Sequence, residues 1–377
     1  MNFRLSLPPA VAAIVLAFAP ALQAAQPIEL ASGSSPNHPR QPQVAIDEAG
    51  GIHVVYGAGE QVSYRRSDDG GKTFSQTTEL PRIANMSLGM RRGPRVAAGK
   101  GFVCVTAIGG KQGKGRDGEI FAYRSEDGGK MWLGPVTVND EPAAAREGLH
   151  AMAAGPKGEL CCVWLDLRSK GTKLFGSTST DGGRTWTKNL LVYESPDGKV
   201  CECCHPSLTF DSQGWIYVMW RNLIAGNRDL YYCISADGGK SFAFATKLGT
   251  GTWPLNACPM DGGAIAALAP GVVATAWRRE KSIYLTIPGD SEERLLGPGE
   301  QAWIAATAAG PYAVWLKKRG ESLQLLAPGQ ERPVELATQA GDPMVAAPAG
   351  GRGPVVAAWE GRNGNKFTVM CQVIAVQ

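Results

Sequence analysis

The chain has 377 residues, of which 19% are charged, and a formal net charge of +4 at pH 7. The basic residues are scattered and form no block, so the sequence gives no indication of nucleic-acid binding or of a membrane-surface protein. The 48 glycines and 25 prolines, with short apolar runs between them, predict many turns and an all-β fold.

The first 25 residues have the pattern of a secretory signal peptide. Arg4 precedes a short apolar run over residues 10–19, and small residues around Ala24 and Ala25 suit cleavage. The run is too short for a membrane span, and no later segment stays apolar for about 18 residues. We expect a single mature domain over residues 26–377, periplasmic or secreted; an uncleaved anchor is the alternative.

Four segments share the template Ser-x-Asp-Gly-Gly-basic-x-aromatic. Their aspartates lie 58, 54 and 56 residues apart, a spacing typical of a solenoid or propeller. Asp and Ser side chains can hydrogen-bond the backbone of a tight turn, and the glycines permit positive φ. We therefore expect the motif to be structural. The four aspartates are Asp69, Asp127, Asp181 and Asp237.

A second repeat predicts the second strand of each blade. Its seven copies read "HVVYG", "VCVTAIGG", "CCVWLD", "YVMWRN", "ATAWRRE", "YAVWLKK" and "VAAWEG". They predict a β-propeller of four-stranded antiparallel blades, with seven blades favoured over six. We expect "PIELAS", near the N-terminus, to add an outer strand to the last blade, because closing the ring removes exposed sheet edges.

The four Asp-containing turns resemble the Asp-box (BNR) repeats of sialidase-like β-propellers. Their combination with a Cys-x-Cys-Cys motif resembles a bacterial secreted branch of that family. The resemblance implies a propeller fold over most of the chain. It extends less well to the active site, because an Arg-Ile-Pro motif is expected in sialidases and only "PRIAN" at Pro81 comes close.

The loops that lead into the inner strands should meet on one face of the propeller, opposite the Asp boxes. Convergent polar groups in such a centre indicate a binding site. Arg221 and Arg278 follow matching tryptophans in adjacent blades, with Asp229 or Asp261 expected between them. We expect Arg221, Arg278, Arg228 and Asp261 to bind a small anionic ligand or a glycan.

The segment "KVCECCHPSL" permits three interpretations. Cys258 could form a disulfide with Cys201, Cys203 or Cys204, as suits an oxidising compartment. The thiols could instead bind copper or zinc together with His205 and His150. The spacing Cys201-x-x-Cys204-His205 also fits covalent attachment of a c-type haem. The nine cysteines are odd in number, so at least one is unpaired or coordinates a ligand.

The first expectation for function is thus an exported propeller whose Cys/His/Arg-rich face binds a metal, a haem or an anion. The alternative is an exo-glycoside hydrolase of sialidase type, so the sequence leaves open whether the protein is an enzyme. Tyr312 lies in a predicted strand and is a poor nucleophile. For the hydrolase, the candidate residues are Arg40, Arg92, Arg221, Arg278, Asp229 and Asp261. The sequence does not predict the oligomeric state.

Overall fold

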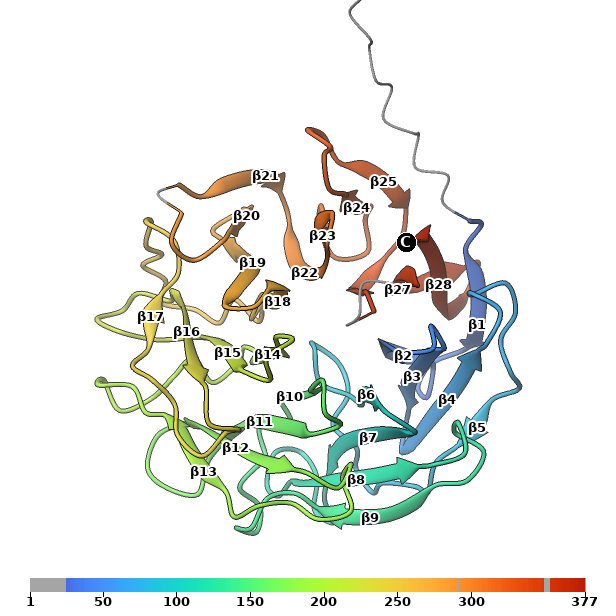
Figure 1. The fold of residues 1–377 in the computed structure, drawn as a ribbon, viewed down its shortest axis with the longest axis horizontal. Helices are drawn as coiled ribbons and strands as arrows, with labels where there is room; N and C mark the ends of the chain where they lie inside the picture. Colours follow the sequence, from blue (N-terminus) through green and yellow to red (C-terminus); the bar gives the residue numbers. More distant parts are fainter. Residues whose placement is uncertain (1–24, 291, 349–352, 377) are drawn as a thin grey trace, which may run out of the picture.

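The computed structural model describes residues 25–290, 292–348 and 353–376, so residues 1–24 of the predicted signal peptide lie outside it. Its strands form seven antiparallel sheets of four strands each. Figure 1 shows these sheets as the blades of a ring, with their innermost strands around the centre. The all-β, seven-bladed prediction is confirmed. No helix in the described part of the chain is long and apolar enough to cross a membrane.

The first four blades follow one another in chain order, each running from the innermost to the outermost strand. Blade 1 contains β2 (Arg40–Ile46), β3 (Ile52–Ala58), β4 (Gln61–Ser67) and β5 (Thr78–Glu79). Blade 2 contains β6 (Arg95–Gly99), β7 (Phe102–Gly109), β8 (Glu119–Ser125) and β9 (Leu133–Thr137). Blade 3 contains β10 (His150–Ala154), β11 (Leu160–Asp166), β12 (Lys173–Ser179) and β13 (Leu190–Tyr193). Blade 4 contains β14 (Ser207–Phe210), β15 (Ile216–Arg221), β16 (Leu230–Ser235) and β17 (Thr246–Lys247).

The remaining blades continue the pattern, and the last one takes its outer strand from the start of the chain. Blade 5 contains β18 (Ala264–Ala269), β19 (Val272–Arg279), β20 (Ser282–Thr286) and β21 (Arg294–Pro298). Blade 6 contains β22 (Glu300–Thr307), β23 (Gly310–Leu316), β24 (Leu323–Leu326) and β25 (Val334–Ala337). Blade 7 contains β26 (Gly341–Ala346), β27 (Pro354–Asn363), β28 (Lys366–Val376) and β1 (Ile28–Gly33).

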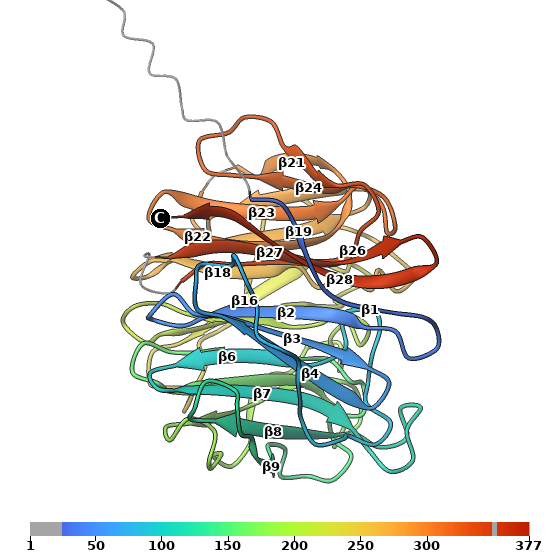
Figure 2. The same ribbon diagram turned by 90° about the vertical axis from the view of Figure 1, so that its right-hand side faces the viewer.

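Strand β1 closes the ring as the sequence predicts. It pairs antiparallel with β28, with Ile28 opposite Cys371 and Gly33 opposite Phe367. Figure 2 shows β1 beside β28 from the side. This pairing gives the otherwise exposed edge of β28 a partner, which protects the blade from edge-to-edge association.

The hydrophobic core is divided among the interfaces between neighbouring blades. In the interface of blades 3 and 4, for example, Val163 and Trp220 are both fully buried. Corresponding hydrophobic clusters lie in each of the remaining interfaces between neighbouring blades. The second strands supply much of this packing, and all five of their tryptophans are buried, at Trp164, Trp220, Trp277, Trp315 and Trp359.

Each Asp box forms the turn after the third strand of its blade. In blade 3, Asp181 Oδ1 accepts hydrogen bonds from Ser179 Oγ (2.7 Å) and from the Thr185 amide (3.0 Å). The Ser179 hydroxyl in turn accepts one from the Gly183 amide at 2.8 Å. Gly182 and Gly183 both have positive φ, which glycine adopts without a Cβ clash. Because the third strand runs antiparallel to the second, these turns lie on the face opposite the loops between second and third strands.

Candidate functional site

A cluster of three cysteine thiols lies in the loop that leads into β14. The Sγ atoms of Cys201 and Cys203 are 3.6 Å apart, those of Cys201 and Cys204 are 3.4 Å apart, and those of Cys203 and Cys204 are 3.9 Å apart. Cys201 is fully buried, and Cys203 and Cys204 are 8% and 1% exposed. Among the described residues, no other group of three His, Cys, Asp or Glu side chains brings its ligand atoms within 4.8 Å of one another.

Two neighbouring backbones hold the cysteine loop in place. The Val200 amide donates to the Thr172 carbonyl at 2.9 Å, in the loop before β12. The Cys201 amide donates to the Arg221 carbonyl at 3.1 Å, at the end of β15. Cys201 is therefore fixed between blades 3 and 4, and the short spacing of the motif folds the other two thiols onto it.

The cluster is polarised toward one thiolate. Hydrogen bonds with Cys203 and Cys204 lower the pKa of Cys201 to about 2, and the charges of Arg221 and Arg228 lower it further. Arg228 Nη1 donates directly to Cys201 Sγ at 3.0 Å. The hydrogen bond with Cys201 raises the pKa of Cys203 to about 12, and burial raises that of Cys204. The arrangement stabilises negative charge on sulfur.

Cys258 lies near this cluster, in the loop before β18. It is exposed, and its presence contributes to raising the pKa of Cys203 and of Arg228. Met260, two residues further on, packs against the three buried cysteines. All nine cysteines are free thiols, so the predicted disulfide is not formed in this structure. Sequence reasoning did not identify Met260 as a neighbour of the cluster, although it lies two residues after Cys258 in the same loop.

The two histidines predicted as ligands lie outside the thiol cluster. His205 Nε2 pairs with the Gly263 carbonyl at 3.0 Å, and its ring stacks on Trp303 with a centroid distance of 5.6 Å. His150 Nε2 pairs with Thr106 Oγ1 at 3.0 Å. Burial lowers the pKa of both rings well below the usual range, so both stay neutral. Neither joins the group of three thiols.

The residues present do not fit a c-type haem. Attachment would need the Cys201 and Cys204 sulfurs to be accessible and His205 to be available as an axial ligand. Both thiols are buried, however, and the His205 ring is held between its carbonyl partner and Trp303. The haem interpretation of Cys201-x-x-Cys204-His205 is therefore not supported by the geometry.

All three guanidinium nitrogens of Arg221 donate to main-chain carbonyls rather than to the predicted anion. Its Nε donates to the Asp261 carbonyl (2.9 Å), Nη1 to the Arg228 carbonyl (2.6 Å) and Nη2 to the Arg278 carbonyl (2.8 Å). The Arg221 side chain is buried, and these bonds connect the loops of blades 4 and 5. The geometry favours a structural role for this residue.

Arg221 and Arg278 both lie over one aromatic ring. Their guanidinium carbons lie 5.2 and 5.6 Å from the centre of the Trp253 ring, within the range of cation–π contacts. Asp229, expected between them, instead accepts a hydrogen bond from the Trp253 amide at 2.8 Å. Sequence reasoning did not predict that both arginines would contact Trp253.

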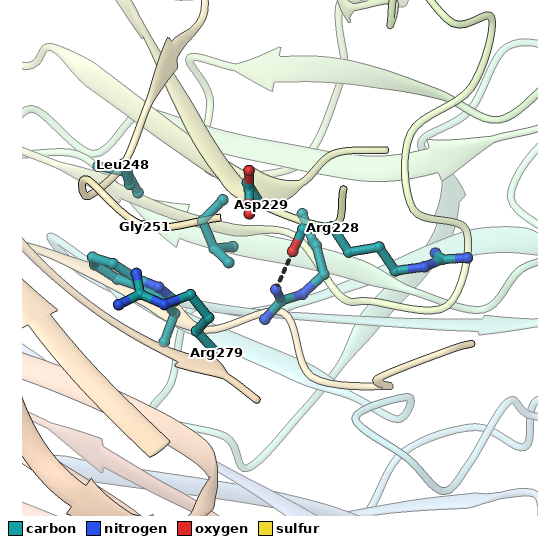
Figure 3. A pocket seen from close by; sticks show the side chains of 8 residues that line it. Arg228, Asp229, Leu248, Gly251 and Arg279 are labelled. Atoms are coloured by element: carbon teal, nitrogen blue, oxygen red, sulfur yellow. Dashed lines mark hydrogen bonds between the residues drawn. The ribbon is translucent and has the colours of Figure 1, made fainter. Parts of the chain in front are cut away.

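The cavity beside Arg221 is too small for an organic ligand. Figure 3 shows Arg228, Asp229 and Arg279 around it, and Arg221 also contributes to its lining. Its volume is about 10 Å³. A cavity needs about 10–15 Å³ to hold one water molecule, so this space accommodates a single water at most.

The propeller axis is filled by Arg91, a residue that sequence reasoning missed. Its Nη1 donates to the Pro343 carbonyl and its Nη2 to the Gln301 carbonyl, both at 2.7 Å, so the side chain reaches blades 6 and 7. Its Nε lies 3.7 Å from Asp342 Oδ1. Asp261 is also buried here and accepts a hydrogen bond from the Gln301 amide at 2.7 Å.

The other predicted arginines have separate partners. Arg40 Nη2 is 2.6 Å from His38 Nε2. Arg92 Nε donates to the Glu147 carbonyl at 2.8 Å. The Arg278 side chain forms an ion pair with Glu300 at 3.1 Å. Arg221 is bound to main-chain carbonyls. The four arginines predicted for a sialidase site therefore have different partners and do not form one binding site for a substrate carboxylate.

A larger cavity, of about 710 Å³, lies between the outer parts of blades 2 and 3. Several of its polar groups are paired with each other. The Asp140 amide donates to Asn189 Oδ1 at 2.8 Å, and the Asn189 amide donates to Asp140 Oδ2 at 2.9 Å. Arg168 donates to both side chains, at 2.9 and 2.8 Å. These bonds join the two blades.

Comparison with solved structures finds the same fold in glycosidases of low sequence identity. An α-L-arabinofuranosidase from Fusarium graminearum has a TM-score of 0.54 and 15% identity, over 93% of this chain and 98% of that one. An α-L-arabinanase from Penicillium chrysogenum has a TM-score of 0.51 and 15% identity, over 94% and 99%. A Trypanosoma rangeli sialidase has a TM-score of 0.51 and 12% identity, over 89% of this chain and 53% of that one.

These similarities define the class of the protein as a β-propeller with the fold of such glycosidases, and at these identities they concern the fold alone. No protein-family model matches the sequence, and no curated protein matches it.

Proposed function

We propose that the protein is an exported β-propeller that binds one thiophilic metal ion, copper(I) or zinc, through Cys201, Cys203 and Cys204. The observation that carries this proposal is the trio of buried sulfurs 3.4, 3.6 and 3.9 Å apart. Sulfur ligands about 2.3 Å from a metal ion lie about 3.8 Å apart in tetrahedral geometry and about 4.0 Å apart in trigonal geometry. The cluster needs little rearrangement to reach either.

The charges around the cluster support metal-thiolate binding. Three thiolates around a monovalent ion carry a net charge of −2. Arg228 donates to Cys201 Sγ, and Arg221 adds a second positive charge nearby. Soft thiolate ligands select copper(I) and zinc over hard cations such as magnesium. Export would also suit a site for ions that arrive from outside the cytosol.

Metal titration under reducing, anaerobic conditions tests the proposal. The mature protein should bind one equivalent of copper(I) or zinc in competition with a chromophoric chelator. Replacing Cys201, Cys203 and Cys204 together by Ser should abolish this binding. Cys233→Ala is the matched control, because Cys233 is a buried cysteine in β16 of blade 4 that lies outside the cluster. Far-UV circular dichroism should show that both variants remain folded. Unchanged binding in the triple variant would refute the site.

Exo-glycoside hydrolysis of acidic or other terminal sugars is the second candidate function. It is favoured by the shared fold with an arabinofuranosidase, an arabinanase and a sialidase. Against it, the guanidinium groups of Arg91 and Arg221 are both bound to main-chain carbonyls of other loops. Fluorogenic α-sialosides and α-L-arabinofuranosides, assayed with and without added zinc, are the direct test. Turnover that survives in the triple Cys→Ser variant would establish a hydrolase independent of the thiols.

A further inference from the structure

The segment that carries Cys258 and Met260 covers the thiol cluster and adds two more sulfur atoms to it. We propose that residues 256–260 form a sulfur-bearing lid through which the cluster exchanges copper(I), with Cys258 as the first sulfur to meet the ion. This inference rests on the metal-binding function proposed above. It adds the identity of the ion, the route of exchange and the chemistry of the partner.

Both ends of the lid are fixed to the propeller. On one side, Arg228 Nε donates to the Leu255 carbonyl at 3.1 Å, and the Leu255 amide donates to the Gly226 carbonyl at 3.2 Å. On the other side, the Asp261 carbonyl accepts from Arg221 Nε at 2.9 Å, and its carboxylate accepts from the Gln301 amide at 2.7 Å. Between these anchors, residues 256–258 are exposed and belong to no strand. The middle of the segment can therefore move while its ends stay in place.

The exposure of the sulfurs decreases from the lid toward the interior. Cys258 is exposed, Cys203 is 8% exposed, and Cys201 and Cys204 are buried. An ion captured by Cys258 would thus meet Cys203 next and then the two buried thiols.

Arg228 links the lid directly to the buried thiols. The same guanidinium donates to Cys201 Sγ through Nη1, at 3.0 Å, and to the Leu255 carbonyl through Nε, at 3.1 Å. Met260 packs on the three cysteines from the other end of the lid, with a positive φ of 53°. The two ends of the lid are therefore both in contact with groups of the cluster.

This ligand set favours copper(I). A thioether is a ligand for soft copper(I) and a poor one for zinc, which prefers four charged or imidazole ligands in a closed tetrahedron. Three buried thiolates supply a complete coordination shell for copper(I), so Cys258 and Met260 remain available for exchange.

The exchange needs no redox partner. A Cu–S bond to Cys258 forms as its thiol proton passes to solvent, and a Cu–S bond to the donor then breaks as that donor thiolate takes up a proton. In each later step a Cu–S bond to Cys203, Cys201 or Cys204 forms as a Cu–S bond to the preceding sulfur breaks, any thiol proton that is released passes to solvent, and copper stays in the +1 state. The partner implied is a donor or acceptor that presents copper(I) on exposed thiolates.

Copper(I) transfer measured in an anaerobic stopped-flow apparatus tests the lid. The protein is loaded from a copper(I)–glutathione complex, and its release is followed with the chelator bathocuproine disulfonate. Cys258→Ser should still bind one equivalent, with both rates at least tenfold slower. Met260→Leu should also bind one equivalent and exchange it several-fold more slowly, because it removes a sulfur that is available for exchange. Ala257→Ser, at a neighbouring exposed position of the lid, is the control and should match the parent.

The outcomes separate the two proposals. If the parent binds no copper(I), the metal-binding function itself fails. If the parent binds copper(I) and Cys258→Ser exchanges it at the parental rates, the lid is wrong and the metal site stands. If Cys258→Ser binds no copper(I), Cys258 is an obligatory ligand of a closed four-sulfur site, and the exchange route is also wrong.

Discussion

Glu360, in β27, is a carboxyl group whose surroundings raise its pKa. Its Oε1 accepts hydrogen bonds from the Gln41 amide (2.8 Å) and from Gln41 Nε2 (3.3 Å). Burial, together with the negative charge of Asp342, raises its pKa to about 7 even though these bonds favour the charged form. The folded protein therefore keeps a proton between pH 4.5 and 7 that the unfolded chain has already lost.

This retained proton makes stability fall as pH rises through that window, since the folded state binds more protons there than the unfolded state. We expect Glu360→Gln to have little effect at pH 4.5 and to stabilise the protein by about 1–3 kcal/mol at pH 8. Urea denaturation at the two pH values measures this. Glu335→Gln, at an exposed position in β25, is the control. A stability difference that does not change with pH would contradict the assignment.

The residue types at the central face were predictable from the sequence, but their partners were not. Arg221 was expected to bind an anion, because its position after a tryptophan matches that of Arg278. Its actual acceptors are three main-chain carbonyls, two of which lie 40 and 57 residues away in the sequence, and no local pattern encodes those two. The three cysteines were identifiable because their contacts are set by adjacent positions in one loop.

In the Asp-box turn, Asp and Ser side chains accept the hydrogen bonds of backbone amides. Asp181 holds Ser179 and Thr185 through three bonds, including one from Thr185 Oγ1 to Oδ2 at 2.6 Å. These hydrogen bonds lower the pKa of Asp181 to about 2 despite opposing desolvation, so the carboxylate is charged at neutral pH. All these contacts join residues that are close in sequence, so the turn could be predicted from the sequence motif.

Asp181→Ala should lower the free energy of unfolding by about 1–2 kcal/mol, because the Thr185 amide and two hydroxyls lose their acceptor. Thermal and urea denaturation measure the loss, while metal stoichiometry should stay unchanged because the box lies on the opposite face. Asp290→Ala, at an exposed position in the loop that replaces the box in blade 5, should cost much less. Loss of metal binding in a folded Asp181→Ala variant would show that the boxes serve function.

The number of blades could be predicted from the repeated second strands. Most residues of each second strand are buried, and these strands contain the β-branched and aromatic residues that favour β-structure. The inner strands were harder to delimit. In blades 1, 6 and 7 they contain a register shift beside a residue with positive φ, at Gln41, Gln301 and Asp342. Such bulges redirect side chains toward the axis and interrupt the alternation on which strand prediction depends.

At the scale of the whole molecule, the ring determines which loops can meet. Closure by β1 fixes the neighbours of each blade, and Arg91 ties the loop before β6 to blades 6 and 7 across the axis. The thiol cluster lies in the loop before β14, where Met260 of the loop before β18 packs against it. The sequence predicted the shared face but could not predict that an arginine would occupy the centre.

X-ray absorption spectroscopy of the copper(I)-loaded protein is the most direct test of a three-thiolate site. The protein should be reduced and loaded with one equivalent under anaerobic conditions. We predict a first coordination shell of about three sulfur atoms at about 2.2–2.3 Å. A first shell of nitrogen or oxygen atoms near 2.0 Å would contradict the site, because it would place the ion on residues other than Cys201, Cys203 and Cys204.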